Sequence, residues 1–258
     1  LIYFLNIHIS LGKNMPFKNS EDTVSKILKQ IDTALDQGAN KFAAFDADGT
    51  LWSADAGDIF YEYIIKNKLV SLPESPWESF LKMKKESPVI AYLWLAQIFN
   101  GLPLTQVQDW AQKAFEEASP YPTFSQQKQI IDHLHKNNVQ VFIVTASIKW
   151  AVEPCPNLYN IPKANVIGVE TLVTDGIVTN EQYGPVTFRE GKVDGLQFKT
   201  QQKPFFVSGN TFGDLELLKH SSHIRLAMHS ATRDERVFPS EIELLEYAKK
   251  EGWFYLSK

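Results

Sequence analysis

Hydrophobic and polar residues alternate along the chain in blocks that predict helices and strands in turn. Residues 20–37 place apolar side chains on one helical face, with Ser20 suited to the N-terminal cap and Gly38 to the C-terminal cap. The apolar run that follows, KFAAFD at residues 41–46, is too short for a helix and is bounded by polar residues. It therefore predicts a buried central strand that ends in an acidic side chain.

Residues 52–122 have a different pattern, which is helical and poor in strands. Prolines and Gly101 divide this block into segments with helical spacing of apolar residues. The predicted helices cover residues 56–69, 77–85, 89–99 and 105–118. Because this block interrupts the alternation of strands and helices, we expect it to form an inserted helical cap.

The alternation resumes after residue 122. Strands are expected at residues 139–145, 166–170, 204–208, 223–226 and 253–256, and helices at residues 124–136, 192–200, 212–220 and 240–250. The turn Thr174-Asp175-Gly176 predicts a hairpin between the strands at 166–170 and 204–208. Strands that alternate with helices indicate an α/β fold with a Rossmann-like parallel sheet and right-handed crossovers.

This pattern predicts how the chain is organised. We expect residues 15–51 and 123–258 to form the catalytic core, residues 52–122 the cap, and residues 1–14 an N-terminal extension before a native start at Met15. The apolar segment 1–14 is shorter than the ~20 residues of a membrane span and lacks the features of a secretory signal. Cys155 is the single cysteine, which suits a reducing compartment. The sequence therefore predicts a cytoplasmic protein with no membrane partner, and it does not predict an oligomeric state.

The charge of the chain excludes one class of partner. Lys and Arg number 26 against 30 Asp and Glu, which gives a formal net charge of −4. The basic residues are spread thinly and form no stripe that could displace counterions from a phosphate backbone. We therefore do not expect nucleic acid to be a partner.

Two acidic residues stand directly after the first predicted strand, in Asp46-Ala47-Asp48-Gly49-Thr50. Ligands of open α/β sheets bind beyond the carboxyl ends of the strands, so both carboxylates are expected to face a site. One can attack phosphorus while the other protonates the leaving oxygen, and Gly49 permits the tight turn. An EF-hand calcium loop is excluded, because it needs glycine at its sixth position and glutamate at its twelfth. A surface turn is the remaining alternative.

Hydroxyl and ammonium groups follow at later positions. Thr145 ends the predicted strand 139–145, and its hydroxyl, with the backbone N–H groups of Ala146 and Ser147, could hold phosphate oxygens. Lys192 begins a predicted helix, where its ammonium could offset charge on a nucleophile and a phosphoryl group. Taken alone, each fits an ordinary strand end or a solvated helix face.

The segment Gly209-Asn210-Thr211-Phe212-Gly213-Asp214 follows the predicted strand 204–208. Asn210 and Asp214 lie one turn apart at the start of a helix. Hard oxygen ligands that converge from two strand ends suit Mg²⁺. Ordinary helix-capping residues are the alternative.

The order of these motifs resembles that of the haloacid dehalogenase superfamily over residues 41–226: strand–DxDGT, helical insert, strand–Thr, Gly-Lys, strand–GNxxxD. The helical insert looks like the C1-type cap of the phosphoserine phosphatase-like branch. The resemblance implies a Mg²⁺-dependent hydrolase of phosphate monoesters that works through an aspartyl-phosphate intermediate on a small phosphorylated metabolite.

The resemblance also implies roles for individual residues. Asp46 would be the nucleophile and Asp48 the general acid and base. The phosphoryl group would be bound by Thr145, Ala146 and Lys192, and Mg²⁺ by Asp46, Asp48 (through its carbonyl oxygen), Asn210 and Asp214.

Three positions depart from the family's pattern. Asn210 replaces the first aspartate of the GDxxxD motif, so we expect weak Mg²⁺ binding that Asn210→Asp would strengthen. Gly49 replaces a serine and Asp55 replaces a substrate-contacting glutamate of phosphoserine phosphatases. The intact Asp48 disfavours dehalogenation, whereas a degenerate, non-catalytic phosphate-binding protein stays open as an alternative.

The residues around the expected cap bear on the substrate. Aromatic side chains gather there, at Trp52, Tyr61, Tyr63, Trp77, Tyr92, Trp94 and Trp110. The nearby acid Asp55 could pair with an ammonium group, and an aromatic face would add cation–π attraction. Packing of the cap helices is the alternative role for these rings. The pattern favours an amine-bearing ester, which could be phosphoserine, phosphoethanolamine or phosphocholine.

Overall fold

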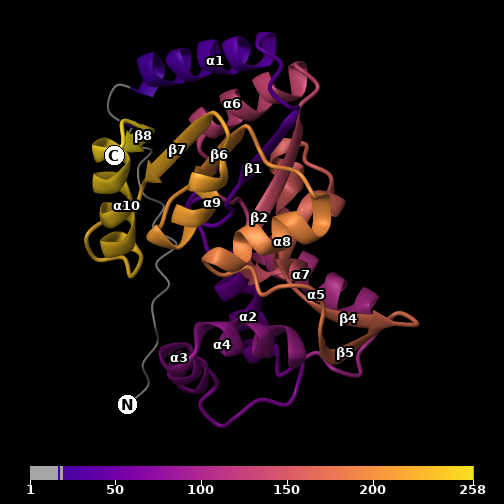
Figure 1. The fold of residues 1–258 in the computed structure, drawn as a ribbon. Coiled ribbons are helices and arrows are strands. Elements are labelled where there is room, and N and C mark those ends of the chain that lie inside the picture. Colours follow the sequence, from indigo (N-terminus) through magenta and orange to yellow (C-terminus); the bar gives the residue numbers. More distant parts are fainter. Residues whose placement is uncertain (1–16, 18–19, 258) are drawn as a thin grey trace.

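The computed structural model describes Phe17 and residues 20–257. Its main sheet has six strands in the order β3-β2-β1-β6-β7-β8, and every neighbouring pair is parallel (Figure 1). The strands are β1 (Phe42–Phe45), β2 (Gln140–Ile148), β3 (Val166–Val169), β6 (Phe206–Gly209), β7 (Ile224–His229) and β8 (Phe254–Ser257). The predicted α/β fold with a parallel sheet is confirmed. The predicted extension at residues 1–14 and the start at Met15 lie outside the described residues.

Helices cover both faces of this sheet. The central strand β1 is buried along its whole length, as its run of apolar residues predicts. Its residues Ala43 and Phe45 pack on the side of α1 and α6, and Phe42 and Ala44 on the side of α8, α9 and α10. These helices are α1 (Ser20–Asp36), α6 (Ser125–Lys136), α8 (Glu190–Thr200), α9 (Leu215–His220) and α10 (Phe238–Lys250).

A group of helices lies between β1 and α6 in the sequence and sits at one end of the sheet (Figure 1). They are α2 (Ala56–Asn67), α3 (Pro76–Glu86), α4 (Pro88–Gln97) and α5 (Leu104–Ala118). The chain enters and leaves this group through two segments that lie side by side. Ser53 N–H donates to Pro122 O at 2.8 Å, and Phe124 N–H donates to Leu51 O at 3.3 Å.

The hairpin of β4 (Thr171–Thr174) and β5 (Ile177–Gln182) follows the predicted turn. Asp175 and Gly176 both have positive φ, at 52° and 78°, as a type I′ turn requires. The hairpin binds the loop between α4 and α5, where Gly101 N–H donates to Val178 O at 2.8 Å. These contacts add residues 171–182 to the segments that pack with the inserted helices.

The division of the chain into core and cap stays a prediction.

The segment between β2 and β3 contains short elements that the hydrophobic pattern did not predict. They are α7 (Lys149–Val152), η1 (Cys155–Tyr159) and η2 (Lys163–Asn165), and a further short turn of helix, η3 (Phe212–Asp214), precedes α9. Within residues 20–257, no helix combines the length and apolar character that a membrane crossing requires.

Candidate active site

Asp46 follows β1 directly and is held in place at the carboxyl end of that strand. Its backbone N–H donates to Ser208 O of β6 at 2.9 Å, which extends the pairing of the two strands by one residue. One carboxylate oxygen lies 2.6 Å from Lys192 Nζ, and the other accepts a hydrogen bond from Thr50 Oγ1 at 2.9 Å. Burial and the nearby Asp214 carboxylate raise the pKa of Asp46 to about 6, against the opposing effect of Lys192. The side chain is thus fixed in position and mostly ionised at neutral pH.

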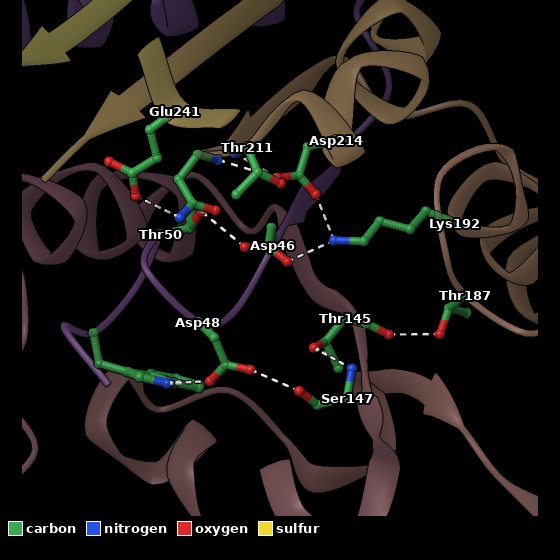
Figure 2. A network of polar contacts seen from close by, with 12 residues as sticks. Asp46, Asp48, Thr50, Thr145, Ser147, Thr187, Lys192, Thr211, Asp214 and Glu241 are labelled. Carbon is green, nitrogen blue, oxygen red and sulfur yellow. Dashed lines mark hydrogen bonds and ion pairs between the residues drawn. The ribbon is translucent and has the colours of Figure 1, made fainter. Parts of the chain in front are cut away.

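Lys192 lies in the first turn of α8 and is buried, with 4% of its surface exposed. Its ammonium bridges Asp46 Oδ1 at 2.6 Å and Asp214 Oδ1 at 2.5 Å (Figure 2). Burial alone would lower the pKa of this ammonium, but the carboxylates of Asp214 and Asp46 outweigh burial and the pKa is raised. The cluster therefore contains two carboxylates and one firmly protonated cation.

Asp214 fixes the loop that follows β6. Its Oδ2 accepts hydrogen bonds from Asn210 N–H at 3.2 Å, Thr211 N–H at 2.9 Å and Thr211 Oγ1 at 3.1 Å. Gly209 makes this approach possible, because a Cβ there would lie 2.6 Å from Asp214 Cβ. The loop thus directs the other oxygen of Asp214, Oδ1, toward Lys192.

Asn210 contacts a buried acid that the sequence did not single out. Its Oδ1 lies 3.2 Å from Thr50 Oγ1, and its Nδ2 donates to Glu241 Oε1 at 2.8 Å. Glu241 also accepts from the backbone N–H groups of Ser230 and Ala231, at 2.8 and 2.9 Å. Burial raises the pKa of Glu241 to about 7. Its position in an ordinary amphipathic helix, 31 residues from Asn210, gives no local signal of this contact.

Asp48 leaves the same loop but points to different partners (Figure 2). Its Oδ1 accepts from Trp52 Nε1 and from Ala56 N–H, both at 2.8 Å, and its Oδ2 contacts Ser147 Oγ at 2.8 Å. Burial, reinforced by the Asp55 charge, raises the pKa of Asp48 well above its usual range. The Asp48 side chain does not join the Lys192 cluster. The candidate metal ligand from Asp48 is therefore its backbone carbonyl oxygen.

Thr145 lies within β2, which runs on to Ile148 instead of ending at the threonine as predicted. The register against β3 shifts in this part of the strand. Thr145 Oγ1 accepts from Ser147 N–H at 3.1 Å, and Thr145 O accepts from Thr187 Oγ1 at 2.5 Å. Ala146, between Thr145 and Ser147, is half-buried. A strand with an irregular end therefore replaces the predicted strand-terminal loop.

Asp55 caps α2 and lies next to a cluster of charged side chains. Its Oδ1 accepts from Asp58 N–H at 2.8 Å, which is the usual bond of a helix N-cap. Asp58 pairs with Arg236 at 3.1 Å and thereby joins α2 to the segment before α10. Lys84 Nζ lies 4.7 Å from the centre of the Tyr92 ring. The predicted substrate residue thus has a structural role as well.

The residues of this cluster fit a hard divalent cation. Asp46 and Asp214 converge on one ammonium, and the Asn210 amide oxygen and Asp46 Oδ2 both lie within reach of Thr50 Oγ1. Over the described residues, no three His, Cys, Asp or Glu side chains form a metal-binding group. A cation would therefore be held by two carboxylates and one amide oxygen, all of which are oxygen ligands of the kind that Mg²⁺ prefers.

Solved structures with the same fold support this arrangement of elements. A protein from Bordetella pertussis Tohama I is 16% identical, with a TM-score of 0.68 over 84% of this chain and 97% of that one. A protein from Anaerococcus prevotii DSM 20548 is 15% identical, with a TM-score of 0.68 over 91% of each chain. At these identities the likeness concerns the fold alone.

Sequence comparison finds one curated relative and one family. The chain is 22% identical over 213 residues to the phosphorylcholine phosphatase of Pseudomonas aeruginosa, in a match that covers 64% of this chain and 60% of that protein. It thus spans about three fifths of the length of the relative. The family described as haloacid dehalogenase-like hydrolase matches residues 43–219. Because that match covers more than half of the chain and contains both acidic motifs, the chain belongs to the haloacid dehalogenase-like hydrolase family.

Proposed function

We propose that this chain hydrolyses phosphate monoesters of small metabolites, with Asp46 as the nucleophile. The observation that carries the proposal is the setting of the Asp46 carboxylate, which is buried at the end of a central strand between Lys192 and Thr50. An ammonium beside a carboxylate nucleophile also offsets the charge of an incoming phosphoryl group. Family membership and the phosphorylcholine phosphatase relative support the same chemistry.

The proposed reaction has two steps. Asp46 attacks phosphorus in line, the bond from phosphorus to the ester oxygen breaks, and Asp48 gives its proton to the departing alkoxide. The raised pKa of Asp48 favours the protonated form that this step needs. Asp48 then takes a proton from water as the water oxygen attacks phosphorus, the bond to Asp46 breaks, and inorganic phosphate leaves.

The phosphoryl oxygens would be bound by groups around Asp46. Lys192 supplies charge, and the Thr145 hydroxyl and the backbone at Ala146 supply hydrogen bonds. Mg²⁺, held by Asp46, Asp214, Asn210 and the Asp48 carbonyl oxygen, would neutralise further charge on the phosphoryl group. The cytoplasmic location expected from the sequence stays a prediction.

Asp48→Asn tests the division of labour between the two acids. Asn is nearly isosteric, and it can still accept from Trp52 and Ala56 and can donate to Ser147 Oγ. It carries no proton for an alkoxide, so kcat for an alkyl phosphate should fall roughly 10²- to 10⁴-fold. p-Nitrophenyl phosphate releases a stable anion, so its first step should be nearly unchanged and its second step slow.

Rapid-mixing kinetics with p-nitrophenyl phosphate measure both steps in the Asp48→Asn variant. We expect a burst of about one p-nitrophenolate per active site, followed by slow turnover. Equal slowing of the burst and of alkyl phosphate cleavage would remove Asp48 from the acid role. Failure of wild-type protein to hydrolyse any ester, with or without Mg²⁺, would favour the non-catalytic phosphate-binding alternative.

We further propose that the leaving group carries an amine. Asp55 lies close enough to Asp48 for its charge to raise the pKa of that catalytic acid, so it borders the place where the leaving group departs. Tyr92 contacts both Lys84 and Phe188, with its ring centre 4.7 Å from the Lys84 ammonium and 5.5 Å from the centre of the Phe188 ring. The Tyr92 ring thus already makes a cation–π contact with the Lys84 ammonium. The phosphorylcholine phosphatase relative supports choline phosphate, and phosphoethanolamine and phosphoserine share the amine.

Asp55→Asn tests amine recognition without breaking the helix cap. Asn caps helices as well as Asp, so the bond to Asp58 N–H should persist while the charge is lost. The preference in kcat/KM for phosphocholine, phosphoethanolamine or phosphoserine over glycerol phosphate should fall by about tenfold, which is 1.4 kcal/mol. Asp109→Asn, on the exposed surface of α5, is the matched control. An unchanged ranking of the esters would exclude Asp55 from recognition.

A further inference from the structure

Glu241 is a buried acid at the site to which the proposed reaction assigns no role. It lies in the first turn of α10 with 1% of its surface exposed. Its Oε2 accepts from two backbone N–H groups, those of Ser230 and Ala231, and its Oε1 accepts from Asn210 Nδ2 at 2.8 Å. All three partners are N–H donors. The carboxylate is therefore oriented as an acceptor toward Asn210.

This contact fixes which end of the Asn210 amide faces the site. A carboxylate accepts hydrogen bonds and an amide NH₂ donates them, so the NH₂ group must face Glu241. The amide oxygen then points the opposite way, 3.2 Å from Thr50 Oγ1, which itself donates to Asp46. Without Glu241, either end of the amide could face Asp46.

The catalytic loop covers the contact between Asn210 and Glu241. Gly49 has a φ of +79°, and a Cβ at this position would lie 2.1 Å from Asn210 Nδ2 and 3.4 Å from Glu241 Oε1. Only glycine allows the loop from Asp46 to Thr50 to approach this closely. The loop, Asn210 and Glu241 are therefore closely packed against one another.

We propose that Glu241 is a positioning residue that holds the Asn210 amide oxygen toward Asp46 and Asp214 and so builds a divalent-cation site without an aspartate at position 210. The inference rests on the proposed Mg²⁺-dependent function. In this arrangement the Glu241 carboxyl group lies behind the Asn210 amide and sets its direction through one hydrogen bond. Groups behind a metal ligand orient that ligand and affect metal affinity about 10- to 100-fold.

The arrangement reverses the sequence-based expectation for Asn210→Asp. A carboxylate at position 210 would face the Glu241 carboxylate at the 2.8 Å separation that now joins a donor and an acceptor. At a pH above the pKa of about 7 of Glu241, neither carboxylate carries a proton to donate, so the two groups repel and the contact that orients residue 210 is lost. Above this pH, the single substitution should therefore weaken Mg²⁺ binding instead of strengthening it.

Glu241→Gln tests the orientation of the amide. The backbone N–H groups of Ser230 and Ala231 cannot turn, so the Gln oxygen should stay with them and its NH₂ group should face Asn210. Asn210 would then turn its own NH₂ group toward Asp46. We expect Mg²⁺ affinity, measured by calorimetry without substrate, to fall by about tenfold or more.

The double variant Asn210→Asp/Glu241→Gln distinguishes positioning from simple damage. The Gln NH₂ group can donate to the carboxylate introduced at position 210, whose second oxygen would face the site. Each single variant should bind Mg²⁺ at least about tenfold more weakly, and the double variant should return to within about threefold of wild type. Glu243→Gln, an exposed acid on the same helix, is the matched control and should bind as wild type does.

Several outcomes would overturn the inference. They are wild-type Mg²⁺ affinity in Glu241→Gln, tighter binding in Asn210→Asp alone, or a double variant that binds no better than Asn210→Asp. The last comparison holds even if Glu241→Gln alone does not fold. If wild-type protein binds no divalent cation, the metal requirement of the proposed function fails together with the inference. If wild-type protein binds Mg²⁺ and the variants bind it equally well, the inference fails while the proposed function is unaffected.

Discussion

Replacing Asp46 by Asn is expected to lower kcat on the order of 10³-fold or more, with the fold unchanged. The amide cannot act as an anionic nucleophile, so no covalent bond to phosphorus can form. Its oxygen can still accept from Lys192, and its NH₂ group can donate to Thr50 Oγ1, which now donates to Asp46. The loss should therefore appear in turnover and not in folding.

Steady-state kinetics with p-nitrophenyl phosphate measure this loss, and thermal unfolding of the same sample checks the fold. Asp22→Asn, on the exposed surface of α1, is the matched control and should keep wild-type kcat. A variant at Asp46 that retained a tenth of wild-type kcat would place the nucleophile elsewhere.

The second large effect is expected for Lys192→Met, which removes the ammonium and keeps a similar side-chain volume. Asp46 and Asp214 would then face one another without the cation that lies 2.6 and 2.5 Å from them. Removing one partner of a buried ion pair costs about 3–5 kcal/mol of unfolding free energy. We expect a loss of about this size without divalent cations, and a fall in kcat on the order of 10²-fold or more.

The stability of Lys192→Met should also depend on pH. Lys192 lowers the pKa of Asp46 against burial, so its removal raises that pKa above the wild-type value of about 6. When the pKa of a carboxyl group is higher in the folded than in the unfolded state, the free energy of unfolding falls as the pH rises from the unfolded-state pKa through the folded-state pKa. The variant should therefore lose more stability at pH 8 than at pH 5.

Denaturant unfolding at both pH values measures this loss, with and without Mg²⁺. Because Mg²⁺ binds the folded state, it should restore part of the stability at pH 8. Lys219→Met is the matched control, since its pair with Glu216 is exposed and contributes ~1 kcal/mol or less. If Lys192→Met were as stable as the Lys219 variant at pH 8, the buried cluster would not have the charges assigned to it.

Much of the fold could be predicted because it depends on local patterns. The apolar run of β1 indicates a strand buried on both faces, and the regular alternation that follows indicates parallel crossovers. The packing of the β4–β5 hairpin against the inserted helices could not be predicted. It depends on contacts such as that of Gly101 with Val178, which join segments far apart in the sequence.

The residues of the site likewise fall into those that the sequence motifs predict and those that only tertiary packing brings into the site. Motif order indicated that Asp46, Lys192 and Asp214 would meet, and the structure brings all three together. Glu241 gave no such indication, because an acid in an amphipathic helix usually faces solvent and its burial results from tertiary packing. Asp48 was recognised by its spacing, but its bonds to Trp52 and Ala56 depend on how the chain turns into α2.

The central claim is that Asp46 carries the phosphoryl group during turnover. Asp48→Asn, which should slow hydrolysis of the intermediate, is mixed with p-nitrophenyl phosphate and Mg²⁺, quenched in acid and digested. Tandem mass spectrometry then locates any added phosphoryl group. We predict the mass of one phosphoryl group on Asp46, absent when Asp46 is replaced by Asn in the same background. A phosphoryl group on Ser147, on Asp214 or on any other residue, or none during a measured burst, would contradict the account.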